Sequence, residues 1–411
     1  MERAYCPDKN SYLELLSLIK KKGPAALATI IEARGSTPQT EGASALFSGK
    51  GLMSGTIGGG VIEAEVLRRA LSAIKRKKSG VFTFNLAHDA SQEKGAICGG
   101  RLRILLETRP EKNEAAIRAL LQSLRRRKPG VLATLIRKDP SKKSLDIGRL
   151  WTGPDIRPNA LRGTPFSGFE REILRALQEK KPLLVHLKPG TLYLEPHFPL
   201  PRLVIAGAGH IGQAVAHLGK LLDFEVIVID DRPEYANGER FPDADRIIVS
   251  DIGEAVRRFP LSSDTYIVIV TRGHARDEEA LRACLKRRAG YIGMIGSRRK
   301  AGLLREKFLG CGWAAPAEFD KVHSPIGISI NSQTVQEIAV SIAAELVSVR
   351  NRNQFGGKDP FPRAQGKPSR PASPSRAGIE SPPCDQGGDA SLEPSPAVPC
   401  GKRRGTARQK K

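Results

Sequence analysis

Aromatic residues are scarce in this sequence, at 5% of 411 residues. Proteins that bind single-stranded nucleic acid stack bases on aromatic side chains, so the shortage argues against a specific nucleic-acid surface. The six cysteines include no Cys-x-x-Cys pair, which argues against a disulfide framework or a zinc site. No uncharged apolar run approaches the roughly 20 residues of a membrane span, and residues 1–8 lack an apolar signal core. We therefore expect a cytoplasmic protein with no membrane segment.

The net charge of +24 is divided unevenly along the chain. The last 61 residues hold ten prolines, and twelve Lys or Arg against five Asp or Glu. Such a composition cannot bury enough apolar surface to offset the entropy of ordering, so residues 351–411 are predicted to form a disordered basic tail. The remaining excess of +17 either attracts anionic ligands or an acidic partner, or serves solubility alone.

The first 200 residues contain one pattern twice, which predicts an α/β domain over residues 10–200. An amphipathic helical stretch, a basic end, a break of Gly and Pro and a short apolar strand occur at residues 10–32 and again at 114–137. Ser11 and Glu14 match a capping box at the start of the first helix. Because the helix and strand recur, we interpret them as scaffold and expect function in the segments that differ between the copies.

Only the first copy is followed by two glycine-containing segments. One is the turn Arg34–Pro38, and the other is the loop Gly55–Gly60, which leads into a helix. Consecutive glycines before a helix expose backbone N–H groups that can hold an anion, although a plain flexible turn has the same composition. Farther along, Cys98 precedes two glycines and Arg101, a setting that favours the thiolate. Cys98 is therefore either a soft metal or sulfur ligand or an inert core residue.

Residues 201–350 alternate β-branched runs with helical stretches, which predicts a second domain with βαβ units and a parallel sheet. We expect strands at 203–206, 225–229, 246–249, 266–270 and 291–295. The first strand runs into Gly207-Ala-Gly209-His210-Ile-Gly212 and a helix over 213–222, which is the fingerprint of a Rossmann-type dinucleotide fold. Asp230 ends the second strand, where an acidic side chain can bind a ribose diol.

Two later segments follow predicted strands, where doubly wound sheets place their ligands. The first is residues 271–277, which include His274. The second is residues 293–300, in which Ser297, Arg298 and two further cations stand at a helix start. Cations there oppose the helix dipole unless an anion binds, so this segment is predicted to receive a phosphate or carboxylate.

With these motifs in this order, the chain resembles the XdhC/CoxI family, accessory proteins of molybdenum hydroxylases such as xanthine dehydrogenase. The matching segments extend over roughly residues 10–350 and are Arg34–Pro38, Gly55–Gly60 with Glu63, Cys98–Gly100, Gly207–Gly212, Asp230–Arg232, His274–Asp277, Ile292–Ser297, His323–Gly327 and Glu337–Ile342. The chain departs from the family pattern at Gln39, where Arg is expected, and at Asn331 and Val335, which replace Gly and Pro. Gln39 weakens an anion-binding role for the first turn, and the other two changes suggest altered loop geometry.

The resemblance implies a chaperone for a cofactor, without catalytic residues or turnover of its own. Such proteins bind the molybdopterin form of molybdenum cofactor, support its sulfuration by a cysteine desulfurase, and deliver it to the hydroxylase apoenzyme, often as homodimers. We predict that the glycine motifs and the basic loop form one cradle for the pterin phosphate, and that Cys98 contacts molybdenum or its sulfur. The predicted cofactor-binding residues are Arg34, Ser36, Thr56, Gly58, Gly59, Gly60, Cys98, Gly207, Gly209, His210, Gly212, Asp230, Ser297 and Arg298.

Two other functions remain open at the level of sequence. The glycine fingerprint alone also fits an NAD(P)-dependent oxidoreductase, for which His274 is the one candidate acid. The charge of +24 suggests a nucleic-acid or membrane-surface binder. Few aromatics and the location of much charge in the predicted tail argue against that second function.

Overall fold

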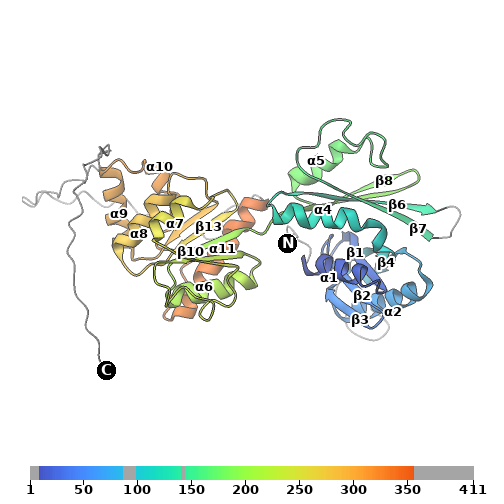
Figure 1. Ribbon diagram of the computed structural model, residues 1–411, viewed down its shortest axis with the longest axis horizontal. Helices are drawn as coiled ribbons and strands as arrows, with labels where there is room; N and C mark the ends of the chain where they lie inside the picture. Colours follow the sequence, from blue (N-terminus) through green and yellow to red (C-terminus); the bar gives the residue numbers. More distant parts are fainter. Residues whose placement is uncertain (1–8, 87–98, 140–143, 356–411) are drawn as a thin grey trace, which may run out of the picture.

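The computed structural model describes residues 9–86, 99–139 and 144–355, which form three β-sheets (Figure 1). Two antiparallel sheets precede residue 198, and a parallel sheet follows. The predicted α/β class with a Rossmann-type parallel sheet is confirmed. Cys98 and the predicted tail beyond Phe355 lie outside the described residues, and the last helix continues to Phe355, past the predicted start of the tail.

The first sheet has the strand order β3-β2-β1-β5-β4 and carries α2 on one face. Its elements are α1 (Lys9–Lys20), β1 (Ala25–Arg34), β2 (Ser44–Ser48), β3 (Gly51–Gly55), α2 (Gly60–Arg76), β4 (Gly80–Asn85) and β5 (Arg101–Glu107). Side chains alternate along β1, so that Ala28 and Ile30 pack toward α2 while Ile31 faces the second sheet. The helix α1 begins at Lys9, which places Ser11 inside it, buried and next to the Ser54 hydroxyl at 3.3 Å. The predicted capping box at Ser11 is therefore wrong.

The second sheet has the order β7-β6-β9-β8 and carries α5 on its outer face. Its elements are η1 (Pro110–Asn113), α4 (Glu114–Arg125), β6 (Gly130–Asp139), β7 (Ser144–Thr152), α5 (Glu170–Glu179), β8 (Leu183–Leu187) and β9 (Gly190–His197). Ile136 and Tyr193 of its inner face pack against Ile31 and Leu105 of the first sheet. The two sheets thus face each other between α2 and α5, and α1 and α4 pack together beside them. The predicted repeat corresponds to α1 with β1 and to α4 with β6.

The parallel sheet has the order β12-β11-β10-β13-β14, and every pair in it is parallel. Its elements are β10 (Arg202–Ala206), α6 (His210–Leu221), β11 (Glu225–Asp230), β12 (Arg246–Val249), α7 (Ile252–Arg258), β13 (Thr265–Ile269), α8 (His274–Cys284), β14 (Tyr291–Met294), α9 (Arg298–Gly310), α10 (Pro316–Phe319) and α11 (Val335–Phe355). Helices α6 and α11 cover one face, and α7, α8 and α9 cover the other. The five predicted strands are confirmed to within one residue at each end.

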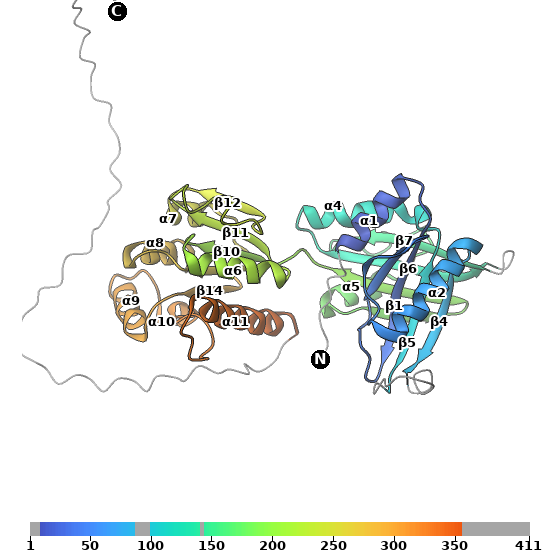
Figure 2. The same cartoon turned by 90° about the horizontal axis from the view of Figure 1, so that it is seen from below.

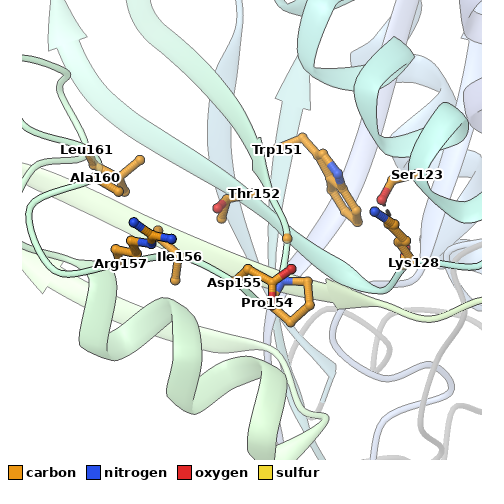
Figure 3. Close-up of a pocket in the computed structure, with 11 residues that line it drawn as sticks. Ser123, Lys128, Trp151, Thr152, Pro154, Asp155, Ile156, Arg157, Ala160 and Leu161 are labelled. Atoms are coloured by element: carbon orange, nitrogen blue, oxygen red, sulfur yellow. Dashed lines mark hydrogen bonds between the residues drawn. The ribbon is translucent and has the colours of Figure 1, made fainter.

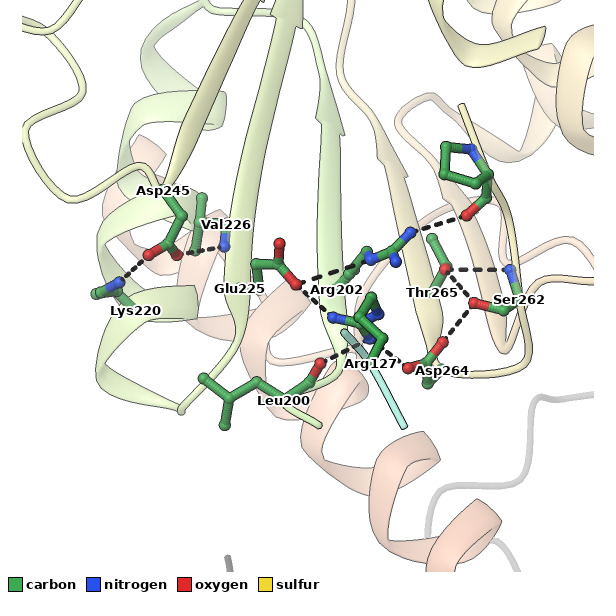
Figure 4. Close-up of polar contacts among 11 residues, drawn as sticks. Arg127, Leu200, Arg202, Lys220, Glu225, Val226, Asp245, Ser262, Asp264 and Thr265 are labelled. Atoms are coloured by element: carbon green, nitrogen blue, oxygen red, sulfur yellow. Dashed lines mark hydrogen bonds and ion pairs between the residues drawn. The ribbon is translucent and has the colours of Figure 1, made fainter. Parts of the chain in front are cut away.

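Residues 198–201 connect the two parts of the chain, and Arg127, which follows α4, binds across this junction (Figure 4). Its guanidinium donates to the carboxylates of Glu225 and Asp264 and, at 2.9 Å, to the carbonyl of Leu200. Glu225 opens β11 and Asp264 precedes β13, so this junction lies at the amino ends of the parallel strands. The carboxyl ends of those strands therefore face away from the junction, as Figures 1 and 2 show.

Replacing Gly212 by alanine is expected to destabilise the Rossmann part. An added Cβ would lie 2.1 Å from the carbonyl oxygen of Gly207, so the turn or α6 must shift, at a cost of about 1–3 kcal/mol. Urea unfolding measures the change. Gly209→Ala is the matched control, because a Cβ at Gly209 meets nothing within 4 Å. Equal losses in both variants would contradict the packing role of Gly212.

Candidate functional site

Three sequence motifs of the first part meet at the end of β1. The turn Arg34–Pro38 lies against Gly100, where an added Cβ would be 2.3 Å from the carbonyl oxygen of Ser36. On its other side lies Gly58, where a Cβ would be 2.7 Å from the ring of Pro38. Only glycine permits these two approaches, since Cβ atoms do not come this close to other atoms. The structure therefore brings together the turn, the glycine loop and the glycines that follow Cys98.

The glycine loop is held by Thr56 and Glu63. The Thr56 hydroxyl donates to a Glu63 carboxylate oxygen at 2.8 Å, and the same oxygen accepts the N–H of Ile57 at 3.3 Å. The N–H of Gly58 in turn donates to the Thr56 hydroxyl oxygen at 3.1 Å. Thr56 therefore shapes the loop from within. The carboxylate of Glu63 also neutralises part of the positive end of α2, which weakens the attraction of that end for an anion.

The open side of this cluster is formed by Gly59 and Gly60. Both have a positive φ, 70° and 57°, and a Cβ on either would meet nothing within 4 Å. The helix α2 begins at Gly60, and the first N–H groups of a helix lack partners within it, so they can bind an anion. Arg34 and Ser36 are exposed beside them, and the Arg34 guanidinium pairs with Glu32 at 2.6 Å. The cluster can thus offer backbone N–H groups and one exposed cation to an anionic ligand.

The second cluster is the turn between β10 and α6. Gly207 lies under the β13 end, where a Cβ would be 2.4 Å from the Val270 carbonyl oxygen, and Gly209 has an open side. The close approaches at Gly207 and Gly212 are those of a dinucleotide-fold turn. The helix α6 starts at His210, three residues before the predicted start, because Gly212 packs inside its first turn. Ligand binding at this turn stays a prediction.

His210 lines a pocket of about 440 Å³ beside α6. The pocket also contains His217, Arg240 and Gln336 from α6, the following loop and α11. His210 and His217 are both exposed, and His217 pairs with Asp243 at 2.7 Å. The imidazole of His210 thus faces this side pocket.

Asp230 is buried at the end of β11 and contacts the glycine turn. Its carboxylate accepts the N–H of Ala208 at 2.7 Å and the Arg232 guanidinium at 2.9 and 3.0 Å. Burial alone would raise the pKa of Asp230, but these hydrogen bonds and the N–H of Arg232 outweigh it and lower the pKa to about 2. Asp230 is therefore ionised at neutral pH and bound on both oxygens.

Ser297 and Arg298 are exposed at the start of α9, and the Ser297 hydroxyl caps the N–H of Lys300 at 3.2 Å. Lys300 itself pairs with Asp277, a buried carboxylate of α8 that also accepts the Thr271 hydroxyl at 2.6 Å. Of the three cations at this helix start, Lys300 is thus neutralised by a carboxylate of the protein itself. Sequence reasoning placed Asp277 and Lys300 in separate segments and missed their pairing.

A histidine–carboxylate pair near β14 was also missed. Nδ1 of His323 lies 2.7 Å from a carboxylate oxygen of Glu345 on α11. The other oxygen accepts the Tyr291 hydroxyl at 2.5 Å and the Gly327 N–H at 2.7 Å. The pair ties α11 to the sheet edge. Asn331, in the following loop, has a φ of 58°, a conformation that asparagine tolerates and glycine favours, so no altered loop geometry is needed there.

A pocket of about 550 Å³ lies in the first part, beside α4 and the end of β7 (Figure 3). Trp151, Lys128, Asp155 and Arg157 are among the side chains that line it. None of the predicted cofactor-binding residues lines it. This pocket and the motif clusters are therefore separate features.

A set of titratable side chains is buried between the two antiparallel sheets. Its members are Tyr12, Glu107, Arg149, Tyr193, Glu195 and His197. Each of these side chains is at most about 3% exposed. Arg149 pairs with Glu107 at 2.8 Å, and Asn113 donates to Glu107 at 2.6 Å. Burial raises the pKa of Glu195 to about 7 and lowers the pKa of His197 to about 3. We call these six residues the interlayer cluster.

The predicted single cradle is not formed within one chain. The turn at Arg34 and the glycine loop belong to the first part, whereas Gly207–Gly212, Asp230 and Ser297 lie at the carboxyl edge of the parallel sheet. Because Arg127 fixes the first part at the opposite, amino edge of that sheet, the two groups do not meet within one chain. The prediction was wrong because sequence order does not tell which edge of a sheet a preceding domain contacts.

Two family models match the two parts that carry these clusters. The model described as the XdhC and CoxI family matches residues 18–85, and the one described as the XdhC Rossmann domain matches residues 203–346. The chain belongs to the XdhC and CoxI family. A crystal structure described as a xanthine dehydrogenase from Bacillus halodurans is similar to it, with a TM-score of 0.69 and 28% identity over 84% of this chain and 98% of that one. This XdhC/CoxI protein therefore shares its fold over both parts.

Three curated relatives extend the comparison. This XdhC/CoxI protein is 28% identical to a probable xanthine dehydrogenase subunit from Bacillus subtilis, over 84% of its length and 98% of the relative's. It is 23% identical to the molybdenum cofactor insertion chaperone PaoD of Escherichia coli, over 81% and 86%. It is 26% identical to the uncharacterized protein YqeB of Escherichia coli over 88% of its own length, but spans only 49% of that relative. Among the described helices, none is long and apolar enough to cross a bilayer.

Proposed function

We propose that this protein is an accessory chaperone that binds molybdenum cofactor, supports its sulfuration and inserts it into a xanthine dehydrogenase-type hydroxylase. The observation that carries the proposal is the meeting of Arg34–Pro38, Gly58 and Gly100 at the end of β1. Gly58 and Gly100 are glycines because a Cβ at either position would collide with the turn Arg34–Pro38. The names of the relatives from Bacillus subtilis and Escherichia coli support the same role.

The described residues suit an anionic cargo. The N–H groups near Gly59 and Gly60 and the exposed guanidinium of Arg34 would hold the phosphate of a pterin. Gly99, which directly follows Cys98, is exposed at the same cluster. The thiol of Cys98 would supply a soft ligand to molybdenum or its sulfur. The protein would act by binding and orienting its cargo, without turnover of its own.

The proposed partners are the hydroxylase apoenzyme, a cysteine desulfurase and a second copy of the chain. A homodimer would bring the cluster at Arg34 of one protomer to the carboxyl edge of the other protomer's parallel sheet. This arrangement would restore the single cradle that one chain does not form. Sedimentation velocity measures the oligomeric state, and a monomer at micromolar concentration would contradict this part of the proposal.

The decisive experiment is mass spectrometry of small molecules released from the protein after expression in a host that makes molybdopterin. The wild type is expected to release molybdopterin, and Cys98→Ala to retain at least ten-fold less. Cys311→Ala is the control, because it removes a thiol from the Rossmann part. Unchanged retention in Cys98→Ala would contradict the role of this thiol, and no molybdopterin in the wild type would contradict the proposed function itself.

A further inference from the structure

The carboxylate of Asp230 has no acceptor position left for a ligand. One oxygen accepts the Ala208 N–H at 2.7 Å and an Arg232 guanidinium nitrogen at 3.0 Å. The other accepts the Arg232 N–H at 3.0 Å and its Nε at 2.9 Å. An ionised carboxylate offers about four acceptor sites, so these four bonds saturate it.

This saturation limits which groups of a ligand can bind at the carboxyl edge of the parallel sheet. In dinucleotide-binding folds, the acidic residue at the end of the second strand accepts hydrogen bonds from a ribose diol, which requires a free oxygen. The neighbouring Asp231 is bound through Oδ2 alone, by Arg276 at 2.5 Å and Arg272 at 3.4 Å, and its Oδ1 is buried without a hydrogen-bond partner among the described residues. Asp230 therefore has no acceptor position for a diol, and the one unbonded oxygen of Asp231 is buried.

Arg232 is fixed on two sides. Its edge donates to Asp230, and its guanidinium carbon lies 3.8 Å from the centre of the Tyr235 ring. Stacking on an aromatic face and a bidentate bond to a carboxylate both restrict the rotation of the guanidinium. Arg232 therefore occupies the acceptor positions of Asp230. Because its guanidinium is used in this way, it is not available to bind the 2′-phosphate of NADP.

We propose that Asp230 and Arg232 form a closed pair that fixes the glycine turn and excludes a ribose diol, so that this edge binds an anionic ligand by its phosphate alone. The ligand class is a phosphate ester without a recognised nucleoside. This inference deepens the proposed function, on which it rests for the identity of the cargo. It favours molybdopterin with a terminal phosphate over a dinucleotide form, and it argues against NAD(P) as a cofactor.

The test is to remove the Arg232 side chain and to measure whether a ribose diol then binds. Arg232→Ala removes the two side-chain bonds to Asp230 and leaves the two bonds from the backbone N–H groups of residues 208 and 232. Calorimetry then measures the binding of ADP-ribose and of its analogue that lacks the 2′-hydroxyl of the adenosine. Arg232→Ala should bind ADP-ribose at least about ten-fold more tightly than the wild type does, because a hydrogen bond to a charged group is worth that factor or more. The 2′-deoxy analogue should gain nothing.

Arg258→Ala is the control, because Arg258 is an exposed arginine at the end of α7 that pairs with Glu254 at 2.5 Å, outside the candidate site. It should leave the affinity for ADP-ribose unchanged. If Arg232→Ala does not fold, Arg232→Lys serves instead, since lysine cannot bind both oxygens in the same way. A wild type that prefers ADP-ribose over the deoxy analogue, or a folded variant that shows no new preference, would overturn the proposal. Neither titration involves molybdenum cofactor, so failure here is distinct from failure of the proposed function.

Discussion

Glu195→Gln is expected to stabilise the first part of the protein at pH 8 and to have little such effect at pH 4. Glu195 is 2% exposed in the interlayer cluster, and burial raises its pKa to about 7 although Arg149 lowers it. In the unfolded chain the same carboxyl has a pKa of about 4.3. Between these two values the folded state binds the extra proton, so stability falls as pH rises. Glutamine does not ionise and removes this loss, about 3–4 kcal/mol at roughly 1.4 kcal/mol per pKa unit.

His197 gives the opposite pH dependence and must be considered with Glu195. Its ring nitrogen lies 3.3 Å from the Glu195 carboxylate, and burial lowers its pKa to about 3. An unfolded histidine takes up a proton below about pH 6.5, so this residue makes stability fall as pH drops through that value. In the wild type the two slopes oppose each other between about pH 4.5 and 6.5. In Glu195→Gln only the contribution of His197 to the pH dependence remains, so the free energy of unfolding should rise steadily with pH over this range.

Urea unfolding from pH 4 to pH 8 tests this prediction. The protein has two tryptophans, Trp151 in the first part and Trp313 in the Rossmann part. In a Trp313→Phe background the fluorescence of Trp151 reports the first part alone. Glu172→Gln is a suitable control, because Glu172 lies in the first turn of α5, outside the interlayer cluster. Parallel pH profiles for the wild type and Glu195→Gln would show that Glu195 is ionised in the folded protein.

Removing the charge of Arg149 should cost the first part about 3–5 kcal/mol. Arg149 and Glu107 are 1% and 2% exposed and pair at 2.8 Å between the two sheets. Arg149→Met keeps an apolar chain of similar length but leaves Glu107 ionised and buried without its cation, which is the expensive way to break a buried ion pair. The same Trp151 signal measures the loss.

The double variant Glu107→Leu with Arg149→Met separates the ion pair from simple packing. It should recover most of the loss, because apolar replacements of both partners leave no buried charge. Asn113 then keeps its bond to the Ile147 carbonyl at 3.1 Å. Arg118→Ala is the surface control, since its pair with Glu114 is about half exposed and should change stability by less than about 1 kcal/mol. A loss that stays the same in the double variant would rule out the unpaired charge as its cause.

The parallel sheet could be predicted from the sequence because four of its five strands are continuous apolar runs that are buried on both faces. The sequence also located the turns at Gly207 and Gly58, where only a residue without a side chain fits. The sequence did not reveal that the guanidinium of Arg232 binds both oxygens of Asp230, because the order Asp-Asp-Arg does not determine the side-chain conformation of the arginine. The interlayer cluster was missed for a different reason. Tyr193, Glu195 and His197 alternate along β9, a pattern that normally marks a solvent face, and only the opposing sheet makes it an interior.

The ion pairs of Arg127 lie far from the outer ends of both parts. Strand β6 begins three residues after Arg127 and has ten residues, so its far end is roughly 30 Å from that arginine. On the other side, the five residues of β10 place the carboxyl edge of the parallel sheet about 17 Å away. A rotation of about 10° around Arg127 therefore moves the end of β6 by roughly 5 Å and the sheet edge by about 3 Å. Any change in the angle between the two parts would therefore displace the far end of each part most.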